Sequence, residues 1–186
     1  MDVKEAINKR RSYRSLNPID INDELIKDLA DCASLAPSCK NSQPWRFIFV
    51  YSKTQLEKLM PTITPPNEKW VVNASMIIVV FSNVEYDCII KERLYYLFDT
   101  GLATAFLILR ATELGLVAHP IAGFEEEKVK KILGIPNVMR VIALIIIGRK
   151  SPKIDKNLTE LMRATEFNKP VRLKFKEFSY INKYSL

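Results

Sequence analysis

Residues 88–114 predict a long helix that is apolar around most of its circumference. The apolar positions fall on nearly every face of such a helix: Leu94, Leu97, Phe98, Gly101, Leu102, Ala105, Ile108 and Leu109. A helix of this kind is buried, because none of its faces is polar enough to lie in water. We therefore expect the central helix of the fold here, ending at Gly115, on a face that a partner subunit can share.

Four short apolar runs predict strands around this helix. They cover residues 45–50, 75–81, 116–121 and 141–147, and the second run is apolar throughout, which predicts burial on both faces. Further helices are predicted over residues 2–9, 54–60 and 125–133, and over a segment that Asp20 or Asn22 caps and Pro37 ends. Because helices and strands do not alternate regularly, the pattern favours an α+β fold over a doubly wound sheet.

The length of 186 residues, 48% of them hydrophobic, predicts a single domain over residues 1–186. Residues 150–186 differ from the rest because they are polar and basic, with aromatic residues at intervals: Phe167, Phe175, Phe178, Tyr180 and Tyr184. A C-terminal extension of this composition is expected to cover an apolar surface, either of its own core or of a partner.

The formal net charge of +7 first suggests nucleic acid as a partner. The basic residues are scattered, however, apart from Lys9, Arg10, Arg11 and Arg14 and a loose C-terminal set. This distribution favours a generally basic protein, with a phosphate-bearing small molecule as the alternative. We expect no nucleic-acid partner.

The cysteines and the histidine exclude several kinds of site. Cys32, Cys39 and Cys88 are an odd set without metal-ligand spacing, so we expect no disulfide framework, no metal site and a reducing compartment. His119 is the single histidine, which leaves no basis for a zinc site or a histidine-based triad, and we expect it to be structural. The N-terminal residues do not resemble a signal peptide, and no stretch predicts a membrane span, so we expect a cytoplasmic protein without membrane contact.

Three segments carry groups that suit a flat, phosphate-bearing ligand. Residues 10–14 (Arg-Arg-Ser-Tyr-Arg) present planar donor forks that match phosphate oxygens, unless they form a solvated basic turn. Residues 37–45 offer amide side chains for the edge of a heterocycle, or for capping their own backbone. In residues 119–124, the small residues Ala122 and Gly123 allow a flat ligand to approach the backbone closely. The alternative is that they only form a tight turn between a strand and a helix. There is no Walker loop and no G-x-G-x-x-G fingerprint.

Together these segments resemble the nitroreductase family of FMN-dependent oxidoreductases. Residues 10–14 are similar to its R-R-S-x-R signature, and residues 36–47 (A-P-S-C-K-N-S-Q-P-W-R-F) to its A-P-S-S-x-N-x-Q-P-W-R-F motif. Matching segments follow in the family's order, and the resemblance extends from residue 3 to about residue 150: Asn67-Glu68-Lys69, Asp99-Thr100-Gly101, Gly115-Leu116 and Ile121-Ala122-Gly123-Phe124.

The resemblance implies an α+β sandwich, with a mixed or antiparallel central sheet flanked by helices, that forms a homodimer with two FMN molecules at its interface. The C-terminal extension would embrace the partner subunit. One subunit would contact FMN through Arg10, Arg11, Ser12 and Arg14, and the other through Pro37, Ser38, Cys39 and Asn41. Asn67 would reach the isoalloxazine, while Ala122 and Gly123 would place backbone amides near flavin N5. Arg149, or else Lys169 or Arg172, would complete the phosphate site.

The implied activity is hydride transfer from NADH or NADPH to FMN, and then to a nitroaromatic, a quinone or a similar small electrophile, in a ping-pong mechanism without a protein base. The alternative is a flavin-binding carrier or sensor without turnover. Three positions depart from the family pattern. Cys39 replaces a serine, His119-Pro120 replaces a frequent Cys-Trp, and Trp70 stands where some members carry a lysine, which leaves the choice of nucleotide open.

Overall fold

The protein, seen here as a computed structural model that describes residues 1–184, is built on one antiparallel sheet. Its strands are β1 (Leu16–Asn17), β2 (Arg46–Val50), β3 (Met76–Ser82), β6 (Val117–Ile121) and β7 (Arg140–Lys150). They follow the order β1-β7-β3-β2, and β6 also pairs with β7. The predicted strands are all present, with ends that differ by a few residues, and the α+β fold is confirmed.

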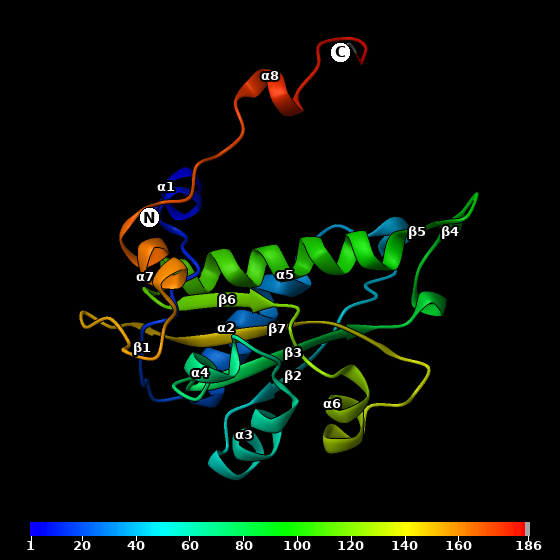
Figure 1. The fold of residues 1–186 in the computed structure, drawn as a ribbon. Coiled ribbons are helices and arrows are strands. Elements are labelled where there is room, and N and C mark those ends of the chain that lie inside the picture. Colours follow the sequence, from blue (N-terminus) through cyan, green and yellow to red (C-terminus); the bar gives the residue numbers. More distant parts are fainter. Residues whose placement is uncertain (185–186) are drawn as a thin grey trace.

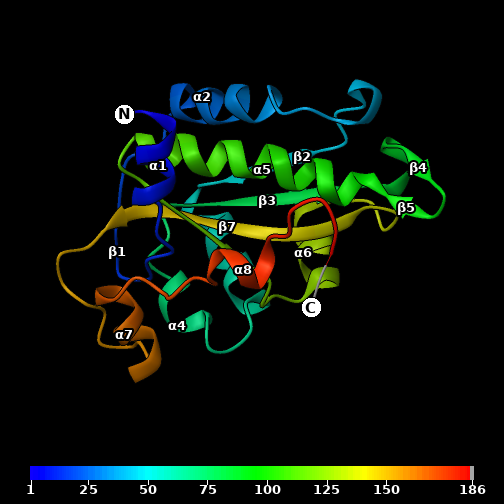
Figure 2. The same ribbon diagram turned by 90° about the horizontal axis from the view of Figure 1, so that it is seen from above.

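Helices cover both faces of this sheet (Figures 1 and 2). One layer contains α2 (Asp23–Ser34) and α5 (Tyr95–Glu113), and the other contains α3 (Lys53–Leu59), α4 (Glu68–Val71) and α6 (Glu126–Leu133). Successive side chains of β3 alternate between the two layers, since a strand directs neighbouring residues to opposite faces. Met76, Ile78 and Val80 pack toward α2 and α5, whereas Ile77 and Val79 pack toward the other layer. The predicted burial on both faces is confirmed.

Local sequence explains several of the helix ends. Asn22 caps α2, because its side chain accepts a hydrogen bond from the Leu25 N–H at 2.8 Å. Helix α5 ends before Gly115, whose φ of +74° lies in the left-handed region that glycine tolerates best. The remaining short elements are α1 (Val3–Lys9), which packs against α5, and the 3-10 turns η1 (Cys39–Asn41), η2 (Met60–Thr62) and η3 (Val84–Tyr86).

The prediction of one helix over residues 88–114 is wrong for its first part. Residues 88–94 contain a hairpin, formed by β4 (Ile89–Ile90) and β5 (Arg93–Leu94), and α5 begins only at Tyr95. The turn residues Lys91 and Glu92 have φ angles of 49° and 67°, as a two-residue hairpin turn requires. A short apolar run fits a strand as well as a helix, so periodicity alone placed this boundary wrongly.

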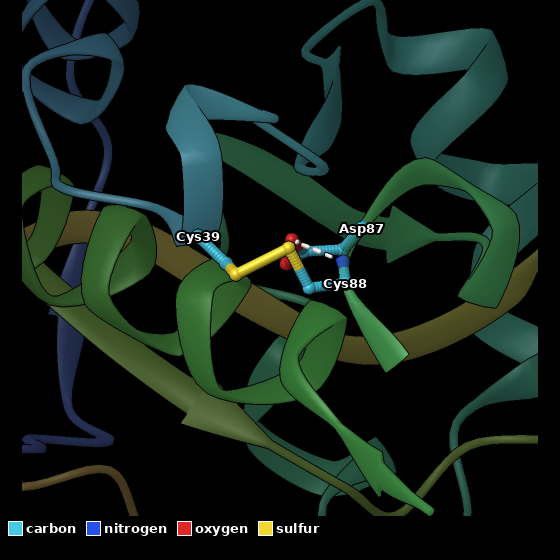
Figure 3. Close-up of side chains that lie close together, drawn as sticks. All are labelled: Cys39, Asp87 and Cys88. Atoms are coloured by element: carbon cyan, nitrogen blue, oxygen red, sulfur yellow. Dashed lines mark hydrogen bonds between the residues drawn. A yellow bond between two sulfur atoms is a disulfide. The ribbon is translucent and has the colours of Figure 1, made fainter. Parts of the chain in front are cut away.

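The expectation that the cysteines form no disulfide is also wrong. Cys39 and Cys88 are joined by a disulfide, and Cys32 is free. The two bonded residues are 49 positions apart, and the fold brings the loop after α2 against the hairpin before α5 (Figure 3). Spacing along the sequence does not reveal such a contact, because it depends on how the two segments pack.

The C-terminal extension has two parts that differ in their packing. Its first part, including α7 (Glu160–Phe167), covers the protein's own core and buries Leu158 and Met162. Beyond residue 168 the chain leads through α8 (Phe175–Phe178) away from the body (Figure 1). Val171 and Ile181 in this second part are 96% and 75% exposed. Among the helices of residues 1–184, we find none with the length and apolarity of a transmembrane span.

Candidate functional site

Residues 10–14 lie at a hollow of about 280 Å³ between the exit of α1 and the end of α7. Four guanidinium groups share this small space, and none of them forms an ion pair with a carboxylate of residues 1–184. A space with this size and charge suits a phosphate group. The lining residues are Arg10, Arg11, Ser12, Arg14, Thr165, Pro170 and Arg172.

The C-terminal extension holds this arginine cluster in place. Glu166 is buried, and its carboxylate accepts hydrogen bonds from the backbone N–H groups of Arg14 at 2.8 Å and Ser15 at 3.3 Å. Arg11 donates to the carbonyl oxygens of Thr165 and Asn168 at the end of α7, where a cation is favoured by the helix dipole. Arg11 is therefore partly committed to the fold itself.

Arg10 and Arg14 retain binding capacity. Arg14 donates to Thr165 Oγ1 at 3.0 Å, but its buried Nε has no acceptor within the described chain. Arg10 donates to Ser12 Oγ at 3.2 Å. Burial lowers the pKa of both guanidinium groups. The neighbouring charges of Arg172 and Arg11 add to this effect at Arg10, whereas the Glu166 carboxylate opposes it at Arg14. A bound anion would offset both the burial and the repulsion.

The three candidates for the last basic residue of the site lie in different places. Arg172 lines the same hollow as the cluster. Arg149, the first choice from the sequence, instead lines a separate hollow with Ile19 and Leu114. Lys169 donates through Nζ to the carbonyl oxygen of Asn8 at 3.1 Å. The geometry therefore favours Arg172 over Arg149 and Lys169.

Asn67 and Gly123 meet next to this cluster. A Cβ atom added to Gly123 would lie 2.7 Å from Asn67 Nδ2 and 2.9 Å from Thr64 Oγ1, so a larger residue here would displace the Asn67 and Thr64 side chains. Asn67 Oδ1 accepts a hydrogen bond from Trp70 Nε1 at 3.2 Å, and the Arg14 guanidinium lies 6.0 Å from the centre of the Trp70 ring. Asn67 and Gly123 are thereby connected to residues 10–14 within a single chain.

The turn that contains Gly123 also offers free backbone donors. Ala122 is exposed, and within residues 1–184 no loop or side-chain hydrogen bond uses the amide N–H of Ala122 or of Gly123. A flat ligand that lies against this turn would find two donors at its edge.

His119 and Trp70 pack together in the interior beside the segments that carry Asn67 and Gly123. Their rings stack with centroids 4.6 Å apart, and His119 Nδ1 lies 3.1 Å from the carbonyl oxygen of Tyr13. Burial lowers the pKa of His119 to about 4, against the backbone hydrogen bond to Tyr13, which favours the charged form. His119 is therefore neutral at physiological pH. Trp70 is fully buried and belongs to the core.

Residues 37–45 form a loop with an uncommon backbone conformation. Its position depends on Cys39, whose N–H donates to the buried carboxylate of Asp99 at 2.6 Å, and on Ser38, whose Oγ accepts from the Gln43 N–H at 3.0 Å. Non-glycine residues rarely adopt positive φ angles, and they persist where the surroundings hold them. Three residues of this loop do so, with φ angles of 51°, 59° and 50°: Lys40, Asn41 and Gln43.

This loop and the arginine cluster lie at opposite ends of α5. Cys39 contacts Asp99 in the second turn of the helix, whereas Arg11 lines a hollow together with Thr112 at its other end. An α-helix rises about 1.5 Å per residue, so the two positions on α5 are roughly 20 Å apart. One small ligand therefore does not touch both sets of residues within the same chain.

A comparison with protein-family models identifies the relationship. The model described as "Nitroreductase family" matches residues 7–65 and 63–149. The chain belongs to the nitroreductase family. The match covers residues 10–14 and 37–45 of this nitroreductase-family protein, and it ends where β7 ends and the C-terminal extension begins.

Individual relatives agree with this assignment. A Methanothermobacter thermautotrophicus protein, named for NADH dehydrogenase and NAD(P)H nitroreductase, is 30% identical in an alignment of 153 residues that covers 80% of this chain and 77% of that protein. The crystal structure of a nitroreductase family protein from Clostridium novyi NT has a TM-score of 0.76 at 32% identity, and covers 82% of this chain and 87% of that one. An oxidoreductase structure described as containing FMN has a TM-score of 0.83 at 26% identity, and the match covers 100% of this chain and 94% of that one.

Two residues that position the site were not predicted as site residues. Asp99 belongs to a segment that carried the family resemblance, and its burial with an N–H donor at 2.6 Å shows that it anchors the 37–45 loop. Glu166 lies in the polar extension, where no sequence signal distinguishes it from solvated acids. Only the packing of α7 brings its carboxylate to the backbone of residues 14 and 15.

Proposed function

We propose that this nitroreductase-family protein binds FMN and works as an NAD(P)H-dependent oxidoreductase. The observation that carries the proposal is the hollow with four guanidinium groups and no carboxylate partner among the described residues. The FMN phosphate would neutralise this charge and accept hydrogen bonds from the guanidinium groups that line the hollow. The phosphate ligands would be Arg10, Arg11 through its remaining N–H groups, Ser12, Arg14 and Arg172.

The isoalloxazine ring would lie along the neighbouring turn. Asn67 would hydrogen-bond the ring, and the unused amide N–H groups of Ala122 and Gly123 would donate near flavin N5. Because the 37–45 loop of the same chain lies at the far end of α5, the second side of the ring would be covered from the other subunit. The covering residues would be the partner subunit's Pro37, Ser38, Cys39 and Asn41.

Bound FMN would supply the redox chemistry, accepting a hydride from NADH or NADPH and reducing a small electrophile such as a nitroaromatic or a quinone. The chain's own residues would bind the cofactor and orient it. Guanidinium groups stabilise negative charge, and backbone amides fix the position of the ring edge. His119 is buried and neutral, so it transfers no proton. Nucleotide and electrophile would use the same site in turn, which is a ping-pong order.

The exposed apolar face of α5 supports the proposal of a homodimer. Asp99, Ala103 and Leu107 are buried against the sheet, whereas Leu97 and Phe98 are 44% and 63% exposed. Apolar side chains gathered on one face of a helix favour a protein contact. The apolar residues of the chain beyond residue 168 would find cover on the same partner.

The test is a titration of the purified protein with FMN, followed by anaerobic addition of NADH or NADPH. We expect one FMN per chain and bleaching of the flavin absorbance by at least one nucleotide, with recovery after a quinone is added. A flavin that binds but stays oxidised with both nucleotides would favour a carrier or sensor. A protein that binds no FMN would contradict the proposal.

A further inference from the structure

Cys39 and Cys88 join the 37–45 loop to the β4–β5 hairpin, and Asp87 lies directly beside them (Figure 3). The sulfur atoms and a carboxylate oxygen of Asp87 all lie within 4.8 Å of one another. Both cysteines are partly exposed, and neither belongs to the two buried hydrophobic clusters. The bond can therefore open without exposing the core, and a small thiol can reach it.

Asp87 offers the reduced form of this pair a hydrogen-bond acceptor that the disulfide does not use. One carboxylate oxygen accepts from the Cys88 N–H at 2.7 Å, but the other, Oδ2, is buried without a hydrogen-bond partner among the described residues. A disulfide sulfur has no hydrogen to donate, whereas a thiol beside this oxygen does. Burial and the neighbouring Asp99 raise the pKa of Asp87, whereas hydrogen bonding to the Cys88 backbone and to Ser42 opposes this rise. Reduction of the disulfide would supply a further donor beside Oδ2.

The two segments that the disulfide joins have few other constraints. The hairpin is exposed, since the side chains of Ile89 and Leu94 are 58% and 45% exposed to solvent. The end of the loop is fixed, because Trp45 is buried in the core, but its middle part holds left-handed conformations at three positions. The anchors of this middle part besides Cys39 Sγ are hydrogen bonds, such as the one from the Cys39 N–H to Asp99. A strained loop relaxes when one of its anchors is removed.

We propose that Cys39 and Cys88 form a reversible thiol–disulfide site, whose oxidation state decides whether the 37–45 loop and the β4–β5 hairpin are held together. Oxidation removes two electrons and two protons from the two thiols and forms the S–S bond. A disulfide of the glutathione type accepts them and becomes two thiols. Reduction is the reverse exchange with a small thiol. The consequence for FMN affinity rests on the proposed function, but the exchange itself does not.

The first experiment equilibrates the full-length protein in glutathione buffers from almost fully oxidised to almost fully reduced, with a chelator present. Free thiols are alkylated and located by mass spectrometry. We expect Cys39 and Cys88 to become reduced together within this range, while Cys32 is alkylated throughout. A pair that stays oxidised, or stays reduced, across the whole range would overturn the proposal.

The second experiment measures limited trypsin digestion in the same buffers. The hairpin offers exposed cleavage sites at Lys91 and Arg93, and we expect cleavage there to accelerate about tenfold on reduction, because the hairpin opens locally. Cys88→Ser should be cleaved fast in every buffer, whereas the control Cys32→Ser should respond like the unmodified protein. Equal cleavage in oxidised and reduced buffers would contradict the proposal even if Cys88→Ser does not fold.

FMN titration of the oxidised and reduced protein then connects the pair to the cofactor. We expect the Kd to rise about threefold to tenfold on reduction, since a loosened loop must be ordered again on binding. Protein that exchanges its disulfide but binds no FMN in either state would contradict the proposed function and leave the thiol–disulfide site intact. An identical Kd in both states would overturn the claim that the pair controls the loop.

Discussion

His119 makes the stability of the protein depend on pH through a single buried side chain. Burial lowers its folded-state pKa to about 4, below the ordinary value near 6.5 that holds when the chain is unfolded. Between these values the unfolded chain binds the proton more strongly, so stability falls as the pH decreases from about 6.5 to 4. The loss of stability from this group reaches on the order of 3 kcal/mol when the pH has fallen to about 4.

The variant His119→Asn tests this loss of stability at low pH. The variant keeps a donor toward the Tyr13 carbonyl but lacks the group that titrates, so its unfolding free energy should depend less on pH between 4 and 6.5. Urea unfolding at several pH values measures the difference, since the carboxylates titrate in both proteins alike. Parallel curves for the two proteins would show that His119 does not carry this dependence.

Arg172 and Arg149 are a matched pair for testing the phosphate site. Both side chains are exposed, so neither substitution should affect folding, but only Arg172 lines the arginine hollow. We expect Arg172→Ala to raise the Kd for FMN about tenfold, the value of one charge-assisted hydrogen bond. Arg149→Ala should leave the Kd within about twofold. Riboflavin lacks the phosphate, and its Kd should not respond to Arg172→Ala. The opposite ranking of the two variants would place the phosphate at Arg149.

The disulfide between the loop and the hairpin also stabilises the chain at the level of these elements. Closing a loop over 49 residues restricts the unfolded state and is worth about 4 kcal/mol in the chain-entropy model. Cys88→Ser should therefore lower the free energy of unfolding by about 2–4 kcal/mol, whereas Cys32→Ser should change it little. Chemical denaturation in oxidising buffer checks both values. Equal losses for the two variants would mean that the disulfide adds nothing specific.

Several elements could be predicted from the sequence, and others could not. The strands of the sheet were predicted because continuous apolar runs indicate burial on both faces, as the packing of Ile77 and Ile78 confirms. The β4–β5 hairpin was missed because its apolar residues resemble the helix that follows. The Cys39–Cys88 bond was missed because no spacing rule connects a loop with a hairpin 49 residues away.

The residues of the candidate site were predicted from motifs, but their grouping depends on the whole molecule. The sequence suggested one ligand between residues 10–14 and residues 37–41. The structure puts these segments at opposite ends of α5, and the proposed FMN site would therefore combine the segments of two chains. Arg172 was one of three candidates from the sequence, and only the packing of the C-terminal extension separates it from Arg149.

Assembly of the proposed dimer is predicted to depend on the exposed face of α5. A charge at Phe98, which is 63% exposed, would be buried at the interface without a partner, so Phe98→Glu should give monomers that bind FMN weakly. Val138→Glu is the control, since Val138 is also exposed, at 75%, but lies in the loop between α6 and β7. Analytical ultracentrifugation with and without FMN measures both. A dimer that survives Phe98→Glu would exclude this face as the interface.

Mixed dimers test most directly whether each FMN site combines two chains. One variant, Arg10→Ala/Arg172→Ala, damages the arginine cluster, and the other, Ser38→Ala/Asn41→Ala, damages the loop. If each site joins the cluster of one chain to the loop of the other, a heterodimer of the two variants contains one intact site. A randomly assembled equal mixture should then regain tight FMN binding at about a quarter of its sites, although neither variant binds tightly alone. No recovery in purified heterodimers would contradict the account, because it would place both segments of a site in the same chain.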